Sequence, residues 1–388
     1  MSMSSRILES WALNRNVLLY GPPGTGKTKI LSQLYSQLQD GPSGSGALVA
    51  NLQNQALPLA YKKVEIPEIP GPTKAYWVTF HQSFGYEDFV LGYKPTNSTN
   101  GVELQAHAGV LLDAILELCD EDSKYKSAVI FIDEVNRANA SRVFGEFMTF
   151  LDFDYRSEGS IPLPMPLRQL SYREGVSETI YRLDGTEAKL LEGFTFPRHI
   201  YIVATMNSVD RSAVPIDSAL ARRFNRIEMA PDRSVLERKW GVELDSNTAR
   251  DVELTAHEVA LLLFDFLNVH IANDLGPEFE LGHGLFLGIS DLPQNTNLSS
   301  SDDASWISLA RVWDDVLFPQ LEDRYAGRPE ALIQLLRVTE FAGTDYLWTL
   351  RSVPSQQSNI RALERTKVVE ASVEKIKQSF TFLVSERS

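Results

Sequence analysis

The feature that most constrains the fold of this chain is the segment GPPGTGKT, Gly21 to Thr28. It follows a short apolar run, Val17 to Tyr20, and precedes TKILSQLYSQLQ, whose apolar residues recur at helical spacing. A strand, a glycine-rich turn and a helix in this order match the pattern G-x-x-x-x-G-K-[ST] of a phosphate-binding loop. A chance Gly-Pro turn is the alternative, and the flanking strand and helix argue against it.

Each part of this loop has a chemical reason. Glycines let successive backbone N–H groups point at phosphate oxygens, and the helix N-terminus adds a positive dipole end. Lys27 is expected to reach the β- and γ-phosphates, and the Thr28 hydroxyl to bind Mg²⁺. The residues predicted to bind the nucleotide are Gly21, Pro22, Pro23, Gly24, Thr25, Gly26, Lys27 and Thr28.

An acid pair ends the next strongly apolar run, SAVIFID at 127–133. Ligands bind at the carboxyl ends of parallel strands, so Asp133 is predicted to help hold Mg²⁺. The adjacent Glu134 is predicted to polarise the attacking water as a general base. A solvated acidic turn is the alternative, and the phosphate loop upstream favours the site.

Polar residues also follow the apolar strand that ends in ATMNSVDRS, 204–212. Asn207 and Asp210 are expected beside the γ-phosphate, where Asn207 would hydrogen-bond the attacking water. A turn-forming role for Asn207 and a helix cap at Asp210 remain open. Further on, PIDSALARRF places Arg222 and Arg223 near the end of a short helix. They are either a charge pair at a helix C-terminus or an arginine finger that acts on a neighbouring subunit's nucleotide.

The alternation of strands and helices predicts an α/β fold with a parallel sheet and crossover helices. The expected domains are a nucleotide-binding domain over 1–231 with a hairpin insertion near 160–197, a smaller helical domain over 232–345, and a C-terminal helical tail over 346–388. The polar part of this tail from Ser355 onward is expected to form a solvent-facing helix.

The composition limits which partners the protein can bind and in which compartment it works. Lys and Arg number 37 against 51 Asp and Glu, a formal charge of −14, so nucleic acid must bind through a local basic patch or a partner. The lone Cys119 excludes a disulfide framework and an all-cysteine zinc site. No apolar run reaches the ~18 residues of a membrane span, and no signal peptide is evident. We therefore expect a cytoplasmic protein with no membrane partner.

The order of GPPGTGKT, FIDEVNRAN, ATMNSVDRS and ALARRF resembles that of AAA+ NTPases, and more closely that of the McrB-type motor subunits of 5-methylcytosine restriction systems. DEVNRAN resembles that family's DEINRAN, and MNSVDRS its MNTADRS, with Ser208 and Val209 as departures. FHQSFGYEDFVLGY at 80–93 is similar to its stretch after the second strand. LGHGLF and WDDVLFPQLEDRY are similar to its helical lid. The resemblance covers about residues 6 to 340.

This resemblance implies an AAA+ core followed by a helical lid, a preference for GTP over ATP, and a homo-oligomeric ring, a hexamer, with nucleotide at the subunit interfaces. It implies an McrC-like nuclease subunit as partner and DNA bound through partners or the assembled ring. Asn207 and Asp210 would position the catalytic water, and Arg222 and Arg223 would include the finger supplied in trans.

The chain also departs from that family. Its phosphate loop begins at Gly21, so we expect no DNA-reading domain before it, and neither a nuclease motif nor a guanine-reading N-K-x-D motif is evident. GTP preference therefore rests on the resemblance. The competing interpretations are a MoxR-like AAA+ ATPase chaperone, which the acidic charge suits, and a scaffold that barely hydrolyses nucleotide. The MN-x-x-DRS and FHQSFGYEDF stretches favour the restriction motor over the chaperone, and Lys27, Asp133, Glu134 and Asn207 argue against the scaffold.

Overall fold

The computed structural model describes residues 3–39, 71–98, 101–156, 179–189, 196–210, 214–244, 254–290, 301–341, 345–353, 360–364 and 367–385. The chain divides into two compact units. The first comprises Met1–Gly21 and Lys27–Met229, and the second Pro22–Gly26 and Ala230–Ser388. Five residues of the phosphate-loop segment thus group with the second unit.

The first unit alternates strands with helices. Its described strands are β1 (Asn16–Gly21), β2 (Thr73–Thr79), β3 (Leu91–Ser98), β4 (Gly101–Ala108), β5 (Ser127–Asp133), β6 (Thr179–Tyr181), β7 (Glu187–Lys189), β8 (Ile200–Asn207) and β9 (Asn225–Glu228). Its described α-helices are α1 (Met3–Leu13), α2 (Lys27–Gln39), α4 (Tyr86–Phe89), α5 (Val110–Cys119), α6 (Ala140–Phe144) and α8 (Ser218–Ala221).

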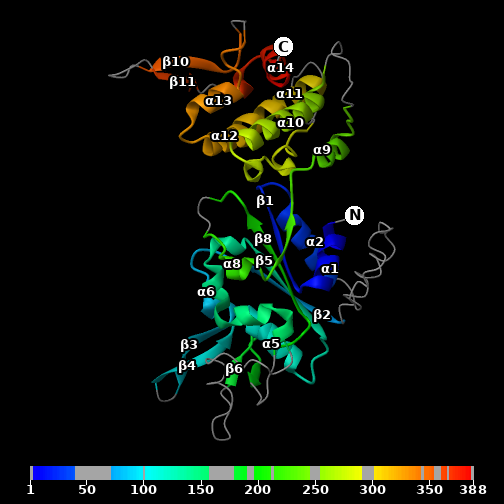
Figure 1. Ribbon diagram of the computed structural model, residues 1–388, viewed down its shortest axis with the longest axis vertical. Coiled ribbons are helices and arrows are strands. Elements are labelled where there is room, and N and C mark those ends of the chain that lie inside the picture. The colour runs from blue at the N-terminus through cyan, green and yellow to red at the C-terminus, as the bar shows by residue number, and fades with distance from the viewer. Residues whose placement is uncertain are drawn as a thin grey trace. The chain divides into compact units, whose positions relative to one another are not determined.

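The main sheet has the order β2-β5-β8-β1-β9, and all of its neighbouring pairs are parallel. In Figure 1 the blue strand β1 lies beside the green strand β8. Parallel neighbours need crossover connections, and the helices between the strands supply them. The predicted parallel sheet flanked by helices is therefore confirmed.

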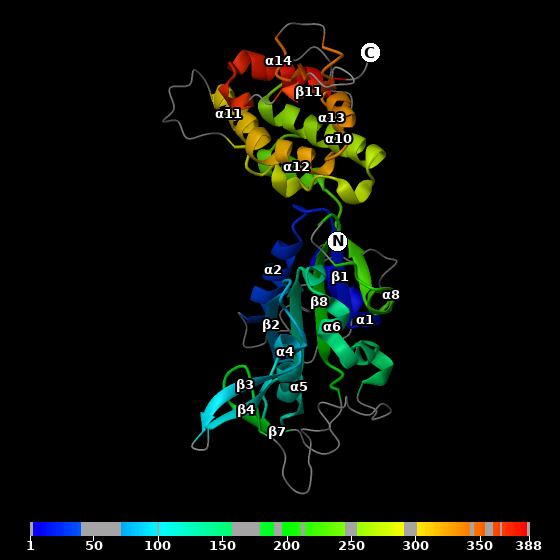
Figure 2. The ribbon, with the colours of Figure 1, turned by 90° about the vertical axis from the view of Figure 1, so that its left-hand side faces the viewer.

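Both faces of this sheet are covered, because successive side chains of a strand point to opposite sides. On β1, Val17 and Leu19 join the core beneath α1 and α2, whereas Leu18 joins the core beneath α5 and α6. On β5, Phe131 likewise joins the core beneath α1 and α2, and Ile130 joins the core beneath α5 and α6. Figures 1 and 2 show the two helix layers on either side of the sheet. The sheet is buried on both faces, so functional side chains can reach solvent only at its edges.

Apolar residues recur at helical spacing over 141–152, but the α-helix in this segment is short. α6 ends at Phe144, the next residue Gly145 has φ 50°, and a 3-10 helix over Gly145–Leu151 follows. A left-handed φ suits glycine, and a Cβ at this position would lie 2.8 Å from the Tyr86 ring. Phe144, Phe147 and Leu151 are nevertheless buried in the core, as the spacing predicted.

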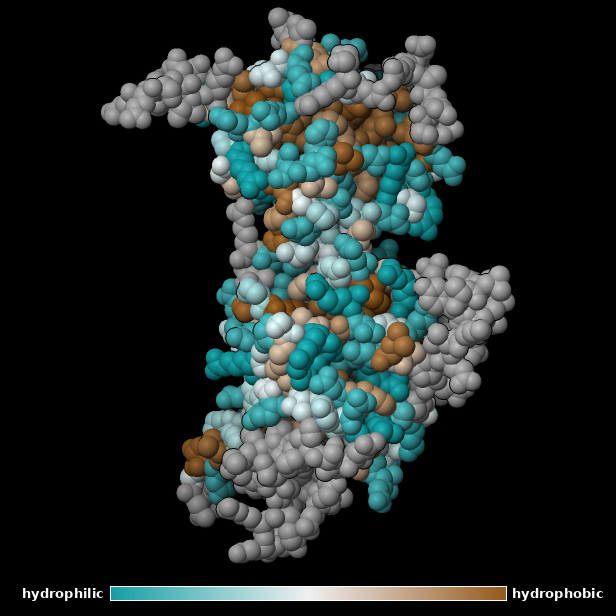
Figure 3. All heavy atoms as spheres, in the orientation of Figure 1, coloured by the Kyte–Doolittle hydropathy of each residue, from teal (hydrophilic) through white to brown (hydrophobic). Residues whose placement is uncertain are grey.

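A second sheet has the order β3-β4-β6-β7. The insertion expected near 160–197 contributes the antiparallel pair β6–β7 to it, and residues 157–178 and 190–195 lie outside the described part of the chain. The sequence did not predict the β3–β4 hairpin. Figure 3 shows a brown patch at the lower left over this hairpin, whose exposed apolar residues are Tyr93, Val102 and Leu104.

An ionic network ties this second sheet to the core. Asp113 and Glu117 of α5 both bind Arg182, which follows β6, and Lys74 of β2 donates to Glu117 at 2.7 Å. The Tyr76 hydroxyl donates to Asp113 at 2.8 Å. Burial opposes ionisation of Glu117, but its hydrogen bonds from Lys74 and other donors outweigh burial and lower its pKa to about 2.

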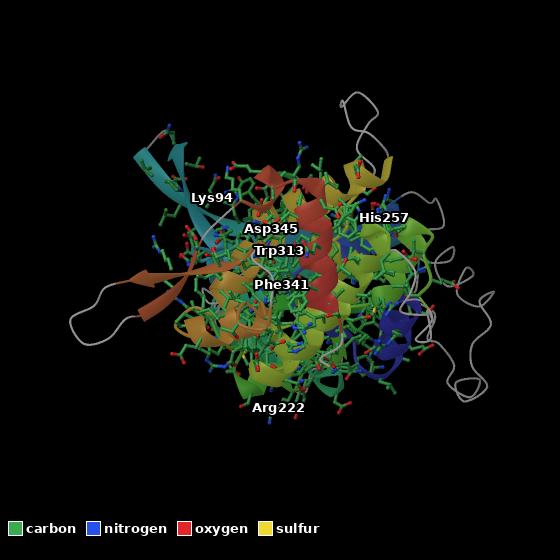
Figure 4. All side chains as sticks on the ribbon, turned by 90° about the horizontal axis from the view of Figure 1, so that it is seen from above. Lys94, Arg222, His257, Trp313, Phe341 and Asp345 are labelled. Atoms are coloured by element: carbon green, nitrogen blue, oxygen red, sulfur yellow. The ribbon has the colours of Figure 1, made fainter. Side chains whose placement is uncertain are left out.

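The second unit is mainly helical, as predicted. Its described elements include α9 (Arg233–Trp240), α10 (Ala256–Asp274), α11 (Ser301–Val312), α12 (Phe318–Arg324), α13 (Pro329–Leu335), β10 (Thr349–Val353), β11 (Ile360–Glu364) and α14 (Val373–Val384). A capping box of Thr255 and Glu258 begins α10. Trp313 lies at the centre of an aromatic cluster, with ring centroids 5.1 Å from Trp348 and 5.3 Å from Phe380 of α14 (Figure 4).

The tail differs from the solvent-facing helix that we expected. Its first part forms the antiparallel β10–β11 hairpin, and α14 begins only at Val373. Ile376, Phe380 and Leu383 are fully buried against the other helices. Their spacing places them on one face of α14, so the tail completes the core of the second unit.

Among the described residues, no helix combines the length and the apolar character that a bilayer crossing requires.

Candidate active site

Three strands of the main sheet end at the same edge. Gly21 ends β1 and pairs in register with Asn207, which ends β8, and Asp133 ends β5. Because parallel strands carry their carboxyl ends to one edge, the polar residues predicted from three separate motifs meet there.

Lys27 begins α2 beside this edge and is only 6% exposed. Its Nζ donates a hydrogen bond to the Gly21 carbonyl at 2.9 Å. Burial lowers the pKa of Lys27 to about 8, although the negative charges of Glu134 and Asp133 act in the opposite direction. The lysine therefore lies within reach of the predicted acid pair.

Thr28 and Asp133 form a pair of oxygen ligands. The Thr28 hydroxyl donates to the two Asp133 carboxylate oxygens at 3.1 and 3.3 Å. Hard oxygen ligands suit Mg²⁺, which is normally bound by one or two carboxylates together with water and phosphate oxygens. The donor set thus fits the predicted magnesium site.

Thr205 of β8 was not predicted and supports both acids. Its hydroxyl donates to Asp133 at 2.5 Å and accepts from the backbone N–H of Glu134 at 3.0 Å. It is 1% exposed. The signal in the sequence is a threonine within the mainly apolar strand IYIVATMN.

Glu134 and Asn207 are in direct contact. The Asn207 side-chain amide donates to a Glu134 carboxylate oxygen at 2.6 Å. Glu134 has φ 56°, a left-handed conformation that is uncommon for a residue with a side chain and that turns the chain sharply after β5. Burial raises the pKa of Glu134, although Arg137 opposes this shift. A raised pKa suits a carboxylate that must accept a proton.

The turn after Glu134 links Asp210, another residue predicted from the sequence, to the site. Arg137 lies 3.1 Å from the Asp210 carboxylate and 3.5 Å from that of Glu134. Asn136 donates to the Asn207 backbone carbonyl at 2.9 Å. In the sequence, DEVNRAN indicated only a resemblance to the family, so Asn136 and Arg137 were not predicted as site residues. Arg211 and Ser212 of the MNSVDRS motif lie outside the described residues.

The two adjacent arginines have different surroundings. Arg222 is exposed at the end of α8, and in Figure 4 its side chain points outward at the lower edge of the view. The Arg223 side chain is only 12% exposed and donates to Asp152 at 2.9 Å and to the Ala219 carbonyl at 2.7 Å.

Within the second unit, residues 22–26 contact the LGHGLF segment. The backbone N–H groups of Gly282 and Gly284 donate to the carbonyls of Pro23 and Gly24 at 3.2 and 2.7 Å. A Cβ at Gly282 would lie 2.2 Å from the Gly24 backbone, so only glycine fits there. Between them His283 accepts a hydrogen bond from the Asp232 backbone N–H at Nδ1, at 3.2 Å.

Comparison with known proteins agrees with this geometry. Residues 69–224 match the model of the AAA domain (dynein-related subfamily). The chain is 28% identical over 328 residues to the Type IV methyl-directed restriction enzyme EcoKMcrB subunit of Escherichia coli strain K12. It is 25% identical over 261 residues to the Type II restriction enzyme BsuMI component YdiS of Bacillus subtilis strain 168. These alignments cover 83% and 60% of this chain.

The chain spans 56% and 62% of the lengths of these two relatives. A solved structure described as a putative ATPase from Cytophaga hutchinsonii aligns with 83% of this chain and 79% of that chain at 14% identity, with a TM-score of 0.28, too low to support an argument. The AAA domain and the similarity to the two restriction components together support a McrB-type AAA+ protein.

Proposed function

We propose that this chain is a GTP-hydrolysing motor subunit that works as a ring, a hexamer by resemblance, and drives the nuclease partner of a restriction and phage-defence system in the cytoplasm. The carrying observation is that Lys27, Thr28, Asp133, Glu134 and Asn207 meet at one edge of the sheet. The similarity to the two restriction components supports the biological setting.

Each residue at this edge has a distinct proposed role. Lys27 neutralises phosphate charge, and Thr28 and Asp133 hold Mg²⁺ together with the nucleotide. Bound Mg²⁺ would supply positive charge to the phosphate oxygens. Glu134 takes a proton from the attacking water, and the Asn207 amide orients the Glu134 carboxylate.

Asp210 acts through Arg137, which contacts both Asp210 and Glu134. It is therefore proposed to position the catalytic carboxylate rather than to touch the water itself. An arginine supplied by a neighbouring subunit completes the site, because a planar guanidinium stabilises the charge that develops on the transferring phosphoryl group. The exposure of Arg222 supports its choice as that residue.

The partners are proposed from the same resemblance. A chain of charge −14 is expected to bind DNA weakly by itself, so DNA is engaged through an McrC-like nuclease subunit or by the assembled ring. The names of the two relatives describe restriction components, which fits a nuclease as the protein that the motor drives.

The test compares hydrolysis of GTP and ATP by the purified chain, with and without the protein encoded by the neighbouring gene. Glu134→Gln should retain GTP binding and lose ~10²- to 10⁴-fold in kcat, the usual contribution of a positioned base. Glu121→Gln, an exposed acid in the same unit, is the matched control and should be unchanged.

A kcat within about threefold of the parent in Glu134→Gln would exclude Glu134 as the base. A preference for ATP that the neighbouring protein does not alter would instead favour the MoxR-like chaperone.

A further inference from the structure

We infer that the adjacent arginines divide their work: Arg222 reaches the neighbouring subunit's nucleotide, and Arg223 is a positioning residue that fixes the helix end from which Arg222 projects. The inference rests on the arginine supplied in trans under the proposed function. It adds that the second arginine never touches nucleotide and acts only through the first.

The helix that carries Arg222 needs outside support. α8 is a single turn, Ser218–Ala221, and a helix this short is not stable by itself. At its start the Asp217 side chain accepts from the Leu220 backbone N–H at 2.8 Å. Its position at the other end must therefore be set by contacts with the rest of the unit.

The main chain at Arg223 supplies the first of these contacts. Its carbonyl oxygen accepts hydrogen bonds from the side-chain amides of Asn14 and Asn16, both at 3.0 Å. Asn16 is fully buried at the start of β1 and also donates to the Leu151 carbonyl at 2.8 Å. Its side-chain oxygen accepts from Arg156 at 3.2 Å. The helix end is thus joined to the rigid amino edge of the sheet.

The side chain of Arg223 supplies the second contact. Its Nε donates to Asp152 at 2.9 Å, and its Nη1 donates back to the Ala219 carbonyl of the same helical turn at 2.7 Å. The planar guanidinium holds both bonds in fixed directions. Arg223 could leave its place only by breaking both bonds and losing the helix-end contact, whereas Arg222 is exposed.

Both sequence interpretations of the arginine pair therefore apply, one to each residue. Arg223 is the charge at the helix C-terminus, where a cation satisfies a terminal carbonyl. Arg222 is the finger. An alanine at either position would lower turnover, so single variants alone do not separate the roles. The relative size of the two losses of turnover, and the loss in the double variant, separate the roles.

The experiment measures single-turnover GTP hydrolysis, GTP affinity and melting temperature for Arg222→Ala, Arg223→Ala and the double variant of the full chain. Arg222→Ala should lower the rate ~10³-fold or more with GTP affinity of the single subunit unchanged. Arg223→Ala should lower it only about 10-fold, because Arg222 remains but is held less well. Arg142→Ala, an exposed arginine on α6, is the control and should be unchanged.

The double variant is decisive. A residue that acts only through Arg222 adds nothing once Arg222 is gone, so the double variant should match Arg222→Ala within about threefold. Asp152→Ala removes the partner of Arg223 at a half-exposed position. It should cost ~3- to 10-fold in the parent and nothing in Arg222→Ala, which keeps the test valid should Arg223→Ala fail to fold.

Two results have separate meanings. If Arg223→Ala loses as much as Arg222→Ala, or the double variant multiplies the two losses, Arg223 acts directly and the inference is wrong. If Arg222→Ala keeps its rate within about threefold while Glu134→Gln loses turnover, the trans arginine of the proposed function is wrong, and the inference fails with it.

Discussion

The two edges of the parallel sheet hold their buried cations in different ways. At the carboxyl edge Lys27, 6% exposed, lies beside Asp133 and Glu134. At the amino edge Arg156, fully buried, donates to the carbonyls of Phe150 and Ile200 at 2.6 Å each.

This difference separates the proposed nucleotide site from a structural one. Arg156 donates to main-chain carbonyls and to the Asn16 side chain. These hydrogen bonds hold the segment after β5 against the starts of β1 and β8. At the carboxyl edge, Asp133 and Glu134 accept from the side chains of Thr28 and Asn207, and a nucleotide and Mg²⁺ can replace these partners. Changes at the amino edge should therefore affect stability, and changes at the carboxyl edge should affect binding and turnover.

The largest effect is expected at the amino edge. Arg156→Met should destabilise the first unit by about 3–5 kcal/mol, because the carbonyls of Phe150 and Ile200 lose their hydrogen-bond donor. Urea unfolding followed by circular dichroism measures this change. The remaining folded protein should bind GTP with the parent's affinity. A stable variant that no longer binds nucleotide would contradict the division between the edges.

At the carboxyl edge the expected result is the reverse. Lys27→Ala should weaken GTP binding by at least ~10²-fold, because the phosphate charge loses a desolvated partner. The folded protein should be as stable as the parent or slightly more so, since burial disfavours the charged form of Lys27. Calorimetric titration and a melting curve measure the two quantities. Unchanged affinity would exclude the segment as a phosphate loop.

Thr205→Val tests the hydroxyl that joins both acids. The isosteric change removes a donor to Asp133 and an acceptor for the Glu134 backbone, so we expect about 1–2 kcal/mol of lost stability. The Mg²⁺ concentration required for half-maximal hydrolysis should also rise. Val203→Thr would place a hydroxyl on the same face of β8, two residues before Thr205, and controls for the chemical change alone. A Thr205→Val variant with the parent's magnesium requirement would show that Thr205 only stabilises the strand.

The smallest effect concerns pH at the amino edge, where Glu117 meets Lys74 of β2. Its folded pKa, about 2, is below the ordinary value of 4.5, so its ionised form stabilises the fold above pH 4.5. That contribution is lost as the pH falls from 4.5 toward 2. The stability difference between the parent and Glu117→Gln should be about 1 kcal/mol at pH 6 and vanish near pH 2. A difference independent of pH would mean that the charge of Glu117 contributes nothing.

The sequence was sufficient for features that short stretches encode. The phosphate loop, the buried strands and the acids at their ends each follow from a local pattern, and parallel pairing brings the strand ends together. The helical second region also follows from local periodicity.

Features that depend on distant partners were not predictable. The Arg137–Asp210 pair joins residues 73 positions apart, and the partner of Arg223 lies on the segment after α6. Nothing in ALARRF distinguishes the two arginines, because the difference arises from Asp152 and the two asparagines at the start of β1. The β3–β4 hairpin was missed because its outer part is exposed and carries no buried periodicity.

The central claim is that Glu134 of one subunit works with Arg222 of its neighbour, and mixing two inactive variants tests it most directly. Arg222→Ala and Glu134→Gln are combined at several ratios, and formation of mixed rings is checked by native mass spectrometry. In such rings some interfaces pair an intact Glu134 with an intact Arg222, so GTP hydrolysis should reappear and be greatest near equal amounts. Turnover that stays at zero at every ratio, with mixed rings present, would contradict the account.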